Sequence, residues 1–167
     1  MSPVLLGIGS NIERESNISA GLDALTRTYG ELQLSPVYES EAVGFDGDPF
    51  YNLVAALETR QGLATLALHL RELEYAMGRP RDASRFSPRT LDVDILTYSD
   101  LSGCHEGVEL PRPEITENAF VLRPLAELAP NALHPVLGQT YADLWAAYDA
   151  ASQPLRRVEF SWAGRLL

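Results

Sequence analysis

The sequence contains no lysine, so all 13 of its basic residues are arginines. This absence excludes a lysine Schiff base and a Walker-type phosphate loop, because both need a lysine amine. Cys104 is the single cysteine, which excludes an internal disulfide and a site built from several thiolates. Long apolar runs and signal-peptide features are also missing. We therefore expect a cytoplasmic protein without a membrane partner.

Positive charge is scarce overall, and the formal net charge is −10. A surplus of negative charge disfavours nonspecific binding to nucleic acids and to anionic membranes. The hydrophobic fraction of 46% and the charged fraction of 22% are typical of a globular protein. A chain of 167 residues can form one substantial core, and no repeat or linker divides it, so we expect a single domain over residues 1–167.

Apolar residues recur with strand or helix periodicity in a definite order along the chain. We expect strands at residues 4–8, 32–42, 52–59 and 91–98, and helices at 18–29 and 63–77, the first capped by Ser16 or Asn17. Residues 99–108 form a loop or a hairpin, helices follow at 118–128 and 141–151, and residues 158–162 form a last strand. This βαββαβ order predicts an α+β, ferredoxin-like core, with an antiparallel sheet flanked by helices in a three-layer αβα sandwich.

Two aspartates, Asp92 and Asp94, lie two positions apart within an apolar run. In a strand, such positions share one face about 6–7 Å apart, whereas Leu91, Val93 and Ile95 point to the opposite face. Neighbouring carboxylates repel each other unless a cation lies between them, and carboxylate oxygens suit a hard divalent cation. A solvent-exposed strand face without a metal is the alternative.

An arginine-rich segment directly precedes the aspartates and contains Arg79, Arg81, Arg85 and Arg89. A guanidinium group matches phosphate oxygens in pairs and keeps its proton. Magnesium is commonly held by one or two carboxylates together with substrate phosphates. The combined segment therefore predicts a phosphoryl-transfer site in which arginines and a metal converge on a polyphosphate. Taken alone, an arginine-rich segment is most often just a solvated basic loop.

The whole segment from Gly78 to Leu96 resembles the signature of the 6-hydroxymethyl-7,8-dihydropterin pyrophosphokinase family, whose members transfer pyrophosphate from ATP to a pterin alcohol in the folate pathway. Similarity extends to the stretch Gly7–Ile12, to strand residues 50–59 and to the block 120–130. Two alternatives remain. The leading interpretation is that this chain itself transfers pyrophosphate from ATP to the pterin alcohol, and its alternatives are a diverged member with weak or altered transfer and a ferredoxin-like binding domain without catalysis.

The resemblance implies a role for individual residues and predicts ATP and a pterin alcohol as substrates, with a monomer or a weak homodimer as the assembly. Two Mg²⁺ ions would be coordinated by Asp92 and Asp94, and the catalytic arginines would be Arg79 and Arg89. The remaining ATP-binding residues would be Arg71, Glu74, Arg81, Arg85, Ile95 and Arg112. The pterin-binding residues would be Ser40, Ala42, Val43, Phe50, Asn52 and Phe120. An aromatic side chain on each side of a flat ring, with a polar group at its edge, is a sound design for such a pocket.

Several positions depart from the family pattern. Arg112 stands where histidine is usual, and Asn118 stands where arginine is usual. An arginine binds phosphate but does not titrate near neutral pH. The charge missing at Asn118 is a candidate for compensation by Arg112 or Arg123. In the arginine-rich segment, Phe86 replaces a usual tryptophan. None of the three histidines has partners in the sequence that suggest catalysis.

Overall fold

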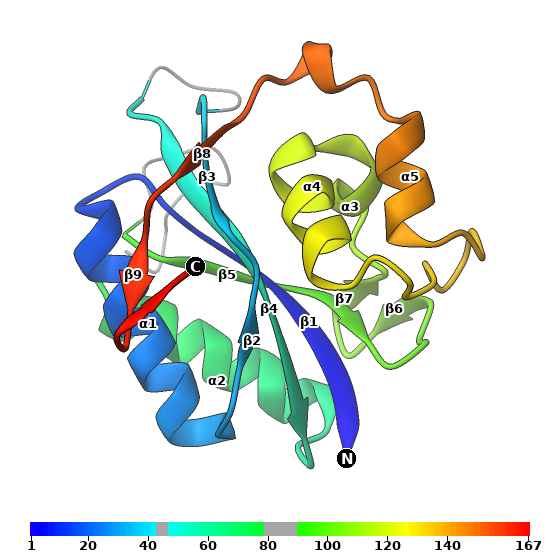
Figure 1. Ribbon diagram of the computed structural model, residues 1–167. Coiled ribbons are helices and arrows are strands. Elements are labelled where there is room, and N and C mark those ends of the chain that lie inside the picture. Colours follow the sequence, from blue (N-terminus) through cyan, green and yellow to red (C-terminus); the bar gives the residue numbers. More distant parts are fainter. Residues whose placement is uncertain (43–46, 79–89) are drawn as a thin grey trace.

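The computed structural model describes residues 1–42, 47–78 and 90–167. Its centre is a six-stranded sheet with the order β5-β1-β4-β3-β8, in which β2 also pairs with β4 (Figure 1). All of the pairings described in this sheet are antiparallel. The strands are β1 (Ser2–Ser10), β2 (Gln33–Leu34), β3 (Val37–Ser40), β4 (Phe50–Thr59), β5 (Asp92–Tyr98) and β8 (Arg156–Val158).

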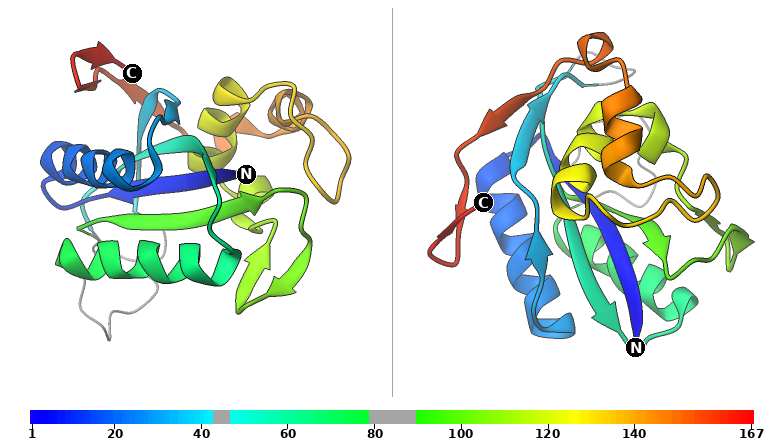
Figure 2. Two further views of the ribbon diagram at one scale, coloured as in Figure 1. Left: turned by 90° about the horizontal axis from the view of Figure 1, so that it is seen from below. Right: turned by 45° about the vertical axis from the view of Figure 1, so that its right-hand side comes forward.

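Helices cover both faces of the sheet, which gives three layers (Figures 1 and 2). One face carries α1 (Arg14–Tyr29) and α2 (Leu63–Ala76), and the other carries α3 (Glu114–Glu117), α4 (Ala119–Leu128) and α5 (Tyr141–Ala147). The smaller elements are β6 (Gly103–His105), β7 (Val108–Leu110), the 3₁₀ helix η1 (Ala150–Ser152), β9 (Ser161–Trp162) and β10 (Arg165–Leu166). The predicted ferredoxin-like α+β fold and the αβα layering are confirmed.

Two hydrophobic cores lie on opposite sides of the sheet because strand side chains alternate between its faces. In β1, Val4, Leu6 and Ile8 are buried in the core under α1 and α2. Val54 of β4 and Leu96 of β5 belong instead to the core under α3, α4 and α5. Burying a large aliphatic side chain stabilises a fold by about 1.5–3 kcal/mol. Because the sheet buries such side chains on both of its faces, it holds both helical layers.

The predicted strand at residues 32–42 is interrupted. It forms β2 and β3, which are separated by Ser35 and Pro36. The amide of Ser35 donates to the carbonyl of Val54 at 2.9 Å, and the Ser35 hydroxyl accepts from the Val54 amide at 2.9 Å. Pro36 has no amide proton to extend the ladder, so the chain resumes regular pairing only at β3. The predicted hairpin alternative for residues 99–108 is realised by β6 and β7.

The predicted first helix starts later than the observed one, and its predicted caps are wrong. Helix α1 begins at Arg14, after Glu13, whose φ of 42° lies in the left-handed region. Asn17 lies inside the helix, and its side-chain amide donates to the Ile12 carbonyl at 2.6 Å. The side chain therefore stabilises the chain before the helix instead of capping a helix that begins at residue 18.

The end of the chain also differs from the prediction. The helix expected at 141–151 ends at Ala147, and the strand expected at 158–162 is replaced by β8 and the β9–β10 hairpin. The turn of that hairpin is made by Ala163 and Gly164, both with positive φ. Trp162 donates its indole N–H to Asp23 Oδ1 at 2.9 Å, which fixes the hairpin against α1 (Figure 1). The described helices include none that is long and apolar enough to cross a membrane.

Candidate active site

Two of the predicted site residues, Asp92 and Asn52, lie in one row across the sheet. Asp92 of β5 is paired with Gly9 of β1, and Gly9 is paired with Asn52 of β4. Asn52 is paired in turn with Tyr38 of β3. We refer to Asp92, Gly9, Asn52 and Tyr38 as the cross-strand row. The row brings one expected metal residue, Asp92, and one expected pterin residue, Asn52, onto the same part of the sheet, although they come from separate parts of the chain.

The cross-strand row faces the layer of α4. In β5, Val93 and Ile95 are buried in the core on the side of α1 and α2, so Asp92 and Asp94 point to the opposite side. This confirms the two-residue periodicity on which the metal prediction rests. In β4, Val54 lies in the core under α4, so Asn52, two residues earlier, shares that face. The row crosses the sheet where β1 ends and β4 begins.

Gly9 makes room for the side chain of Asn52. A Cβ atom at position 9 would lie 2.6 Å from Asn52 Oδ1, closer than real Cβ contacts allow. The side-chain amide nitrogen of Asn52 donates to the Ser40 hydroxyl at 3.0 Å, and both residues are buried. With the amide nitrogen held in this way, Oδ1 is oriented over Gly9. The sequence gives a glycine in the right place, but its partner is visible only in the folded sheet.

The two aspartates form an electrostatically demanding pair. Burial and the neighbouring charge of Asp92 raise the pKa of Asp94 well above its usual range, whereas Arg112 opposes that rise. Arg112 Nη2 lies 3.5 Å from Asp94 Oδ1, and the guanidinium also forms an ion pair with Glu114. A partly buried carboxylate pair of this kind favours a cation beside it. The oxygen donors fit Mg²⁺, which commonly takes one or two carboxylates and completes its shell with phosphates and water.

No third acidic, histidine or cysteine ligand joins the aspartates within the described residues. A closed cage made only of protein ligands is therefore not found in this part of the chain. Two carboxylates with open positions are instead what a metal needs if it is to be shared with a phosphate-bearing substrate. The donor set fits a metal that arrives together with a nucleotide.

Glu74 supports the aspartate strand from the opposite helical layer. Its buried carboxylate accepts the amide hydrogen of Val93 at 2.9 Å, at the free edge of β5 between the two aspartates. Arg71, one turn earlier on α2, is exposed and its Nε lies 3.8 Å from Glu74 Oε1. Both residues were expected at the nucleotide. Glu74 has in addition a structural contact that the sequence does not indicate.

The aromatic residues expected at the pterin lie at the starts of two elements. Phe50 begins β4, opposite Ser40 of β3, and Phe120 lies in the first turn of α4; both are partly buried. Ala42 is partly buried just beyond β3. Ile95, expected near ATP, has its side chain in the core on the side of α2. Only the backbone of Ile95 is therefore available to a ligand on the α4 face.

Asn118, which stands at a usual arginine position, precedes α4. Its side-chain oxygen accepts a hydrogen bond from the side-chain amide nitrogen of Gln153 at 3.2 Å. The side-chain oxygen of Gln153 accepts in turn from the backbone amide of Ala119 at 2.9 Å. Arg123, one candidate for the missing charge, lies 4.7 Å over the Tyr38 ring, and its Nε lies 3.4 Å from Glu127. The Tyr38 hydroxyl also donates to Glu127. This Tyr38–Arg123–Glu127 group at the end of the row was not predicted, although the i, i+4 spacing of Arg123 and Glu127 is a signal for their ion pair.

Five predicted site residues lie outside the described residues. They are Val43, Arg79, Arg81, Arg85 and Arg89. Their roles stay predictions. The residues around them place the two ends of the arginine-rich segment: Gly78 follows α2, and Thr90 precedes the aspartate strand.

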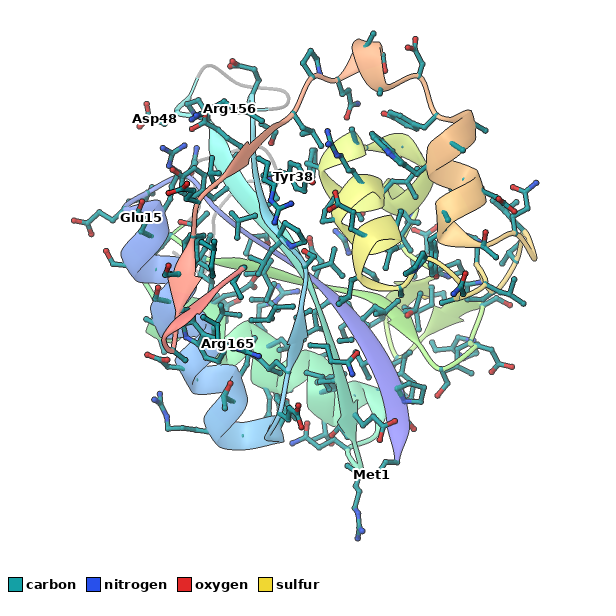
Figure 3. All side chains as sticks on the ribbon, in the orientation of Figure 1. Met1, Glu15, Tyr38, Asp48, Arg156 and Arg165 are labelled. Atoms are coloured by element: carbon teal, nitrogen blue, oxygen red, sulfur yellow. The ribbon has the colours of Figure 1, made fainter. Side chains whose placement is uncertain are left out.

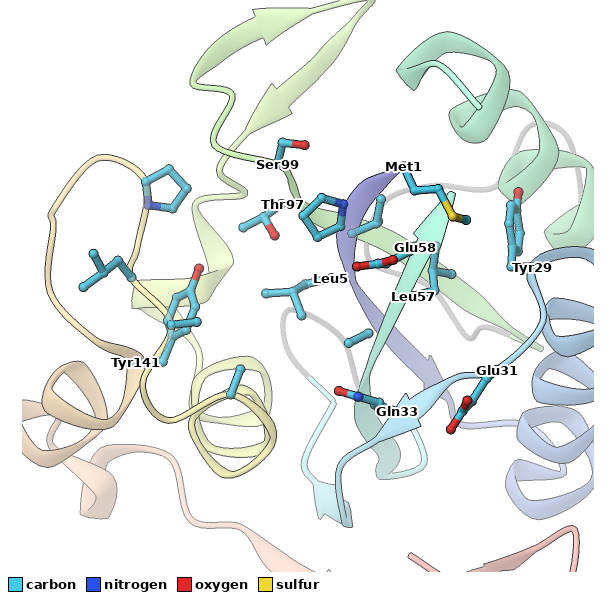
Figure 4. Close-up of a pocket in the computed structure, with 17 residues that line it drawn as sticks. Met1, Leu5, Tyr29, Glu31, Gln33, Leu57, Glu58, Thr97, Ser99 and Tyr141 are labelled. Atoms are coloured by element: carbon cyan, nitrogen blue, oxygen red, sulfur yellow. The ribbon is translucent and has the colours of Figure 1, made fainter. Parts of the chain in front are cut away.

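A cavity of about 560 Å³ lies at the end of the sheet opposite to the cross-strand row, where β1 begins and β4 ends. It is lined by residues from the start of β1, such as Leu5, together with Thr97 of β5 and Tyr141 of α5 (Figure 4). Met1, which also lines it, is far from Asp48 in the loop before β4 (Figure 3). None of the predicted site residues that the structure describes lines this cavity. This cavity is therefore separate from the face that bears Asp92 and Asn52.

Comparison with known proteins agrees with the geometry. The model of the family 7,8-dihydro-6-hydroxymethylpterin-pyrophosphokinase (HPPK) matches residues 5–130. A 2-amino-4-hydroxy-6-hydroxymethyldihydropteridine pyrophosphokinase from Aquifex aeolicus is 33% identical over 138 residues, which cover 81% of this chain and 86% of that protein. The folic acid synthesis protein fol1 of Schizosaccharomyces pombe is 35% identical over 80% of this chain, but the match spans only 19% of the yeast protein.

Solved structures show the same fold at lower sequence identity. The crystal structure of Plasmodium falciparum HPPK-DHPS with SDX-DHP superposes with a TM-score of 0.71 at 14% identity. The match covers 100% of this chain and 49% of the Plasmodium chain, so this chain spans about half the length of that protein. The likeness supports the ferredoxin-like architecture, and the aligned part corresponds to one portion of a larger protein.

Proposed function

This chain belongs to the 7,8-dihydro-6-hydroxymethylpterin-pyrophosphokinase family, and we propose that it carries out pyrophosphate transfer from ATP to 6-hydroxymethyl-7,8-dihydropterin on the face of the sheet that bears Asp92 and Asn52. The observation that carries the proposal is the cross-strand row. It juxtaposes a carboxylate pair suited to a metal and a buried, oriented amide suited to a heterocycle. Transfer between a nucleotide and a pterin needs these two kinds of site side by side.

The reaction is a displacement at phosphorus. The hydroxymethyl oxygen of the pterin attacks the β-phosphorus of ATP in line, a new P–O bond forms, and the bond from the β-phosphorus to the bridging α–β oxygen breaks. The pterin hydroxyl loses its proton and AMP departs with the bridging oxygen. This chemistry requires no covalent enzyme intermediate, so catalysis consists of positioning and charge neutralisation.

On the pterin side, the contribution of the chain is orientation. Asn52 is held by Ser40, and its oxygen is therefore presented to a ligand as a fixed acceptor. Phe50 and Phe120 supply flat apolar faces for the heterocycle, and Ala42 and Val43 complete the pocket. A ring bound in this way would place its hydroxymethyl group toward the aspartate end of the row.

On the nucleotide side, the contribution of the chain is charge. Asp92 and Asp94 would hold Mg²⁺, which supplies neutralisation of the phosphate oxygens when bound. Arg112 lies beside Asp94 and provides a permanent cation for the phosphates. Arg79, Arg81, Arg85 and Arg89 are proposed to add cations from the arginine-rich segment, with Arg79 and Arg89 at the transferring group. Arg71, Glu74 and the Ile95 backbone are proposed at the nucleotide.

The deciding experiment follows AMP release by purified protein. We expect AMP to form only when ATP, magnesium and 6-hydroxymethyl-7,8-dihydropterin are all present. Pterin binding without AMP release would support the diverged alternative. The cause would then be sought at Asn118, which stands where arginine is usual and contacts Gln153. Failure to bind either ligand would overturn the assignment. The presence of two ions, the monomeric or weakly dimeric state and the cytoplasmic location stay predictions.

A further inference from the structure

The side chain of Arg112 lies among acidic groups at the proposed metal site. Its Nη2 is 3.5 Å from Asp94 Oδ1, and the same guanidinium pairs with Glu114. The backbone amide of Arg112 donates to the Leu96 carbonyl at 2.9 Å, which anchors this residue beside the aspartate strand. Its position is therefore built into the fold through both the main chain and the side chain.

The guanidinium carries a charge that it cannot lose at any physiological pH. Asp92, Asp94 and Glu114 each favour that charge, while burial of the guanidinium disfavours it. Arg112 thus supplies Asp94 with a positive partner while no metal ion is bound. A divalent cation that approaches Asp94 must either displace this partner or bind beside it against electrostatic repulsion.

The ion pair of Arg112 with Asp94 is loose, whereas its ion pair with Glu114 helps to anchor the residue. A direct charge-assisted hydrogen bond from a guanidinium to a carboxylate is about 2.7–2.9 Å long, so the 3.5 Å contact with Asp94 is a looser one. Both of these side chains are also one-third exposed, at 33% each. The guanidinium can therefore leave Asp94 without breaking a close bidentate pair, and Glu114 and the Leu96 carbonyl keep the residue in place.

We propose that Arg112 competes with the metal ion at Asp94 and that the phosphates of ATP relieve this competition by drawing the guanidinium away. The inference rests on the proposed function of Asp92 and Asp94 as metal ligands. It makes metal binding and nucleotide binding mutually dependent. Metal alone binds weakly because Arg112 occupies its place, and metal with triphosphate binds well because the arginine then pairs with phosphate. Thermodynamic linkage requires the effect to be reciprocal.

Histidine, the residue usual at this position in the resembling family, would exert far less competition at neutral pH. An unperturbed histidine is mostly neutral there, whereas arginine is fully charged. The substitution Arg112→His therefore isolates the permanent charge, and Arg112→Gln removes both the charge and the titration. Arg60→Gln is the control, because it removes one arginine from an exposed position directly after β4, at the end of the sheet opposite to Asp92 and Asp94.

The test measures Mn²⁺ binding by electron paramagnetic resonance, with and without α,β-methylene-ATP. Without nucleotide, we expect Arg112→His and Arg112→Gln to bind Mn²⁺ about 5- to 10-fold more tightly than the wild type, and Arg60→Gln to match the wild type. With the ATP analogue, we expect the advantage of the Arg112 variants to disappear. The enhancement of metal affinity by nucleotide is then smaller in these variants than in the wild type.

Asp94→Asn separates failure of this inference from failure of the proposed metal site. If Asp94→Asn leaves Mn²⁺ binding unchanged in the presence of the analogue, the metal site itself is wrong and the inference falls with it. If Asp94→Asn abolishes binding but both Arg112 variants bind free Mn²⁺ with wild-type affinity, the metal site stands and the competition is overturned. Circular dichroism of each variant establishes that the compared proteins are folded.

Discussion

Gly9 and Asn52 face each other across β1 and β4, and the space that a Cβ atom would need at Gly9 is occupied by the Asn52 side-chain oxygen, 2.6 Å away. The glycine thus sets where the amide lies, and Ser40 sets how it is turned. The pairing connects the glycine at the end of the first strand to the pterin side of the proposed site. It also explains why this position on a buried strand has no side chain.

Gly9→Ala is expected to impair pterin binding more than folding. The clashing atom is the end of a side chain, so Asn52 can rotate away, but it then loses its hydrogen bond to Ser40. We expect the KM for the pterin to rise about tenfold, consistent with the ~1–1.5 kcal/mol of one oriented hydrogen bond, with the KM for ATP nearly unchanged. Steady-state kinetics with each substrate varied in turn measures the effect.

Gly62→Ala is the control for this substitution, because a Cβ atom at Gly62 meets nothing within 4 Å. Its kinetics should match those of the wild type. Equal increases in the KM for ATP and for the pterin in Gly9→Ala would indicate a general distortion of the sheet. That outcome would contradict the specific link between Gly9 and Asn52.

Asp92→Asn is expected to separate stability from activity. Burial and the negative charge of Asp92 raise the pKa of Asp94, and Arg112 opposes that rise, so we expect the two carboxylates to repel each other in the metal-free protein. Removing one charge should therefore stabilise the metal-free protein, by up to about 1 kcal/mol, the scale for like charges on neighbouring positions of a sheet. Transfer should fall at least about 10³-fold, because a metal ligand is lost.

Thermal unfolding in EDTA measures the stability of the metal-free protein, and the rate of AMP release measures the transfer activity. Asp100→Asn, at an exposed position after the end of β5, is the control and should change neither. A lower unfolding temperature for Asp92→Asn in EDTA would mean that Asp92 has a stabilising partner instead of a repulsive one. Near wild-type AMP release would contradict the metal assignment.

The aspartate strand was predictable because its signal is local. Alternation with a period of two places Leu91, Val93 and Ile95 on one face and the aspartates on the other, and the structure confirms this division. The ferredoxin-like order was predictable for the same reason, since each element has its own periodicity. Local patterns do not, however, determine which residues meet across strands. The pairs Gly9–Asn52 and Tyr38–Arg123 therefore emerge only from the folded sheet.

The errors at the ends of elements have a related cause. Asn17 has the residue type of a helix cap, but its side chain bonds to the Ile12 carbonyl from within the helix. Near the C-terminus, the apolar run around Phe160 suggested one strand. In the structure, Phe160 lies between β8 and β9 in the sequence, and its side chain packs into the core under α1 and α2. At Asn17 the competing contact is local, only five residues away, whereas at Phe160 packing against distant parts of the core overrides the local propensity.

Glu74→Leu is expected to destabilise the protein by about 1–3 kcal/mol, the range for leaving a buried backbone donor without its partner. The amide of Val93 would lose the carboxylate that accepts its hydrogen at the free edge of β5. Glu74→Gln keeps an acceptor oxygen and should lose less. Urea unfolding compares both variants with Glu72→Leu, an exposed position on the same helix that should be nearly neutral. If Glu74→Leu were as stable as the wild type but bound ATP weakly, the role of Glu74 would be in nucleotide binding alone.

Tyr141 should make the stability of the protein depend on pH in alkaline solution. Burial raises its pKa to about 12 from an ordinary value of 10.0, and only 1% of the residue is exposed. Below pH ~10, the folded and unfolded states are both protonated, so the group contributes no slope. Between pH ~10 and ~12, only the unfolded state loses the proton, so stability falls by about 1.4 kcal/mol per pH unit.

Tyr141→Phe should remove this slope while the contributions of Tyr29 and Tyr38, whose pKa values burial also raises, remain in both proteins. Urea unfolding of the two proteins at pH 9 and pH 11 measures the difference directly, and parallel losses of stability in both would show that Tyr141 ionises as readily in the folded chain as in the unfolded one.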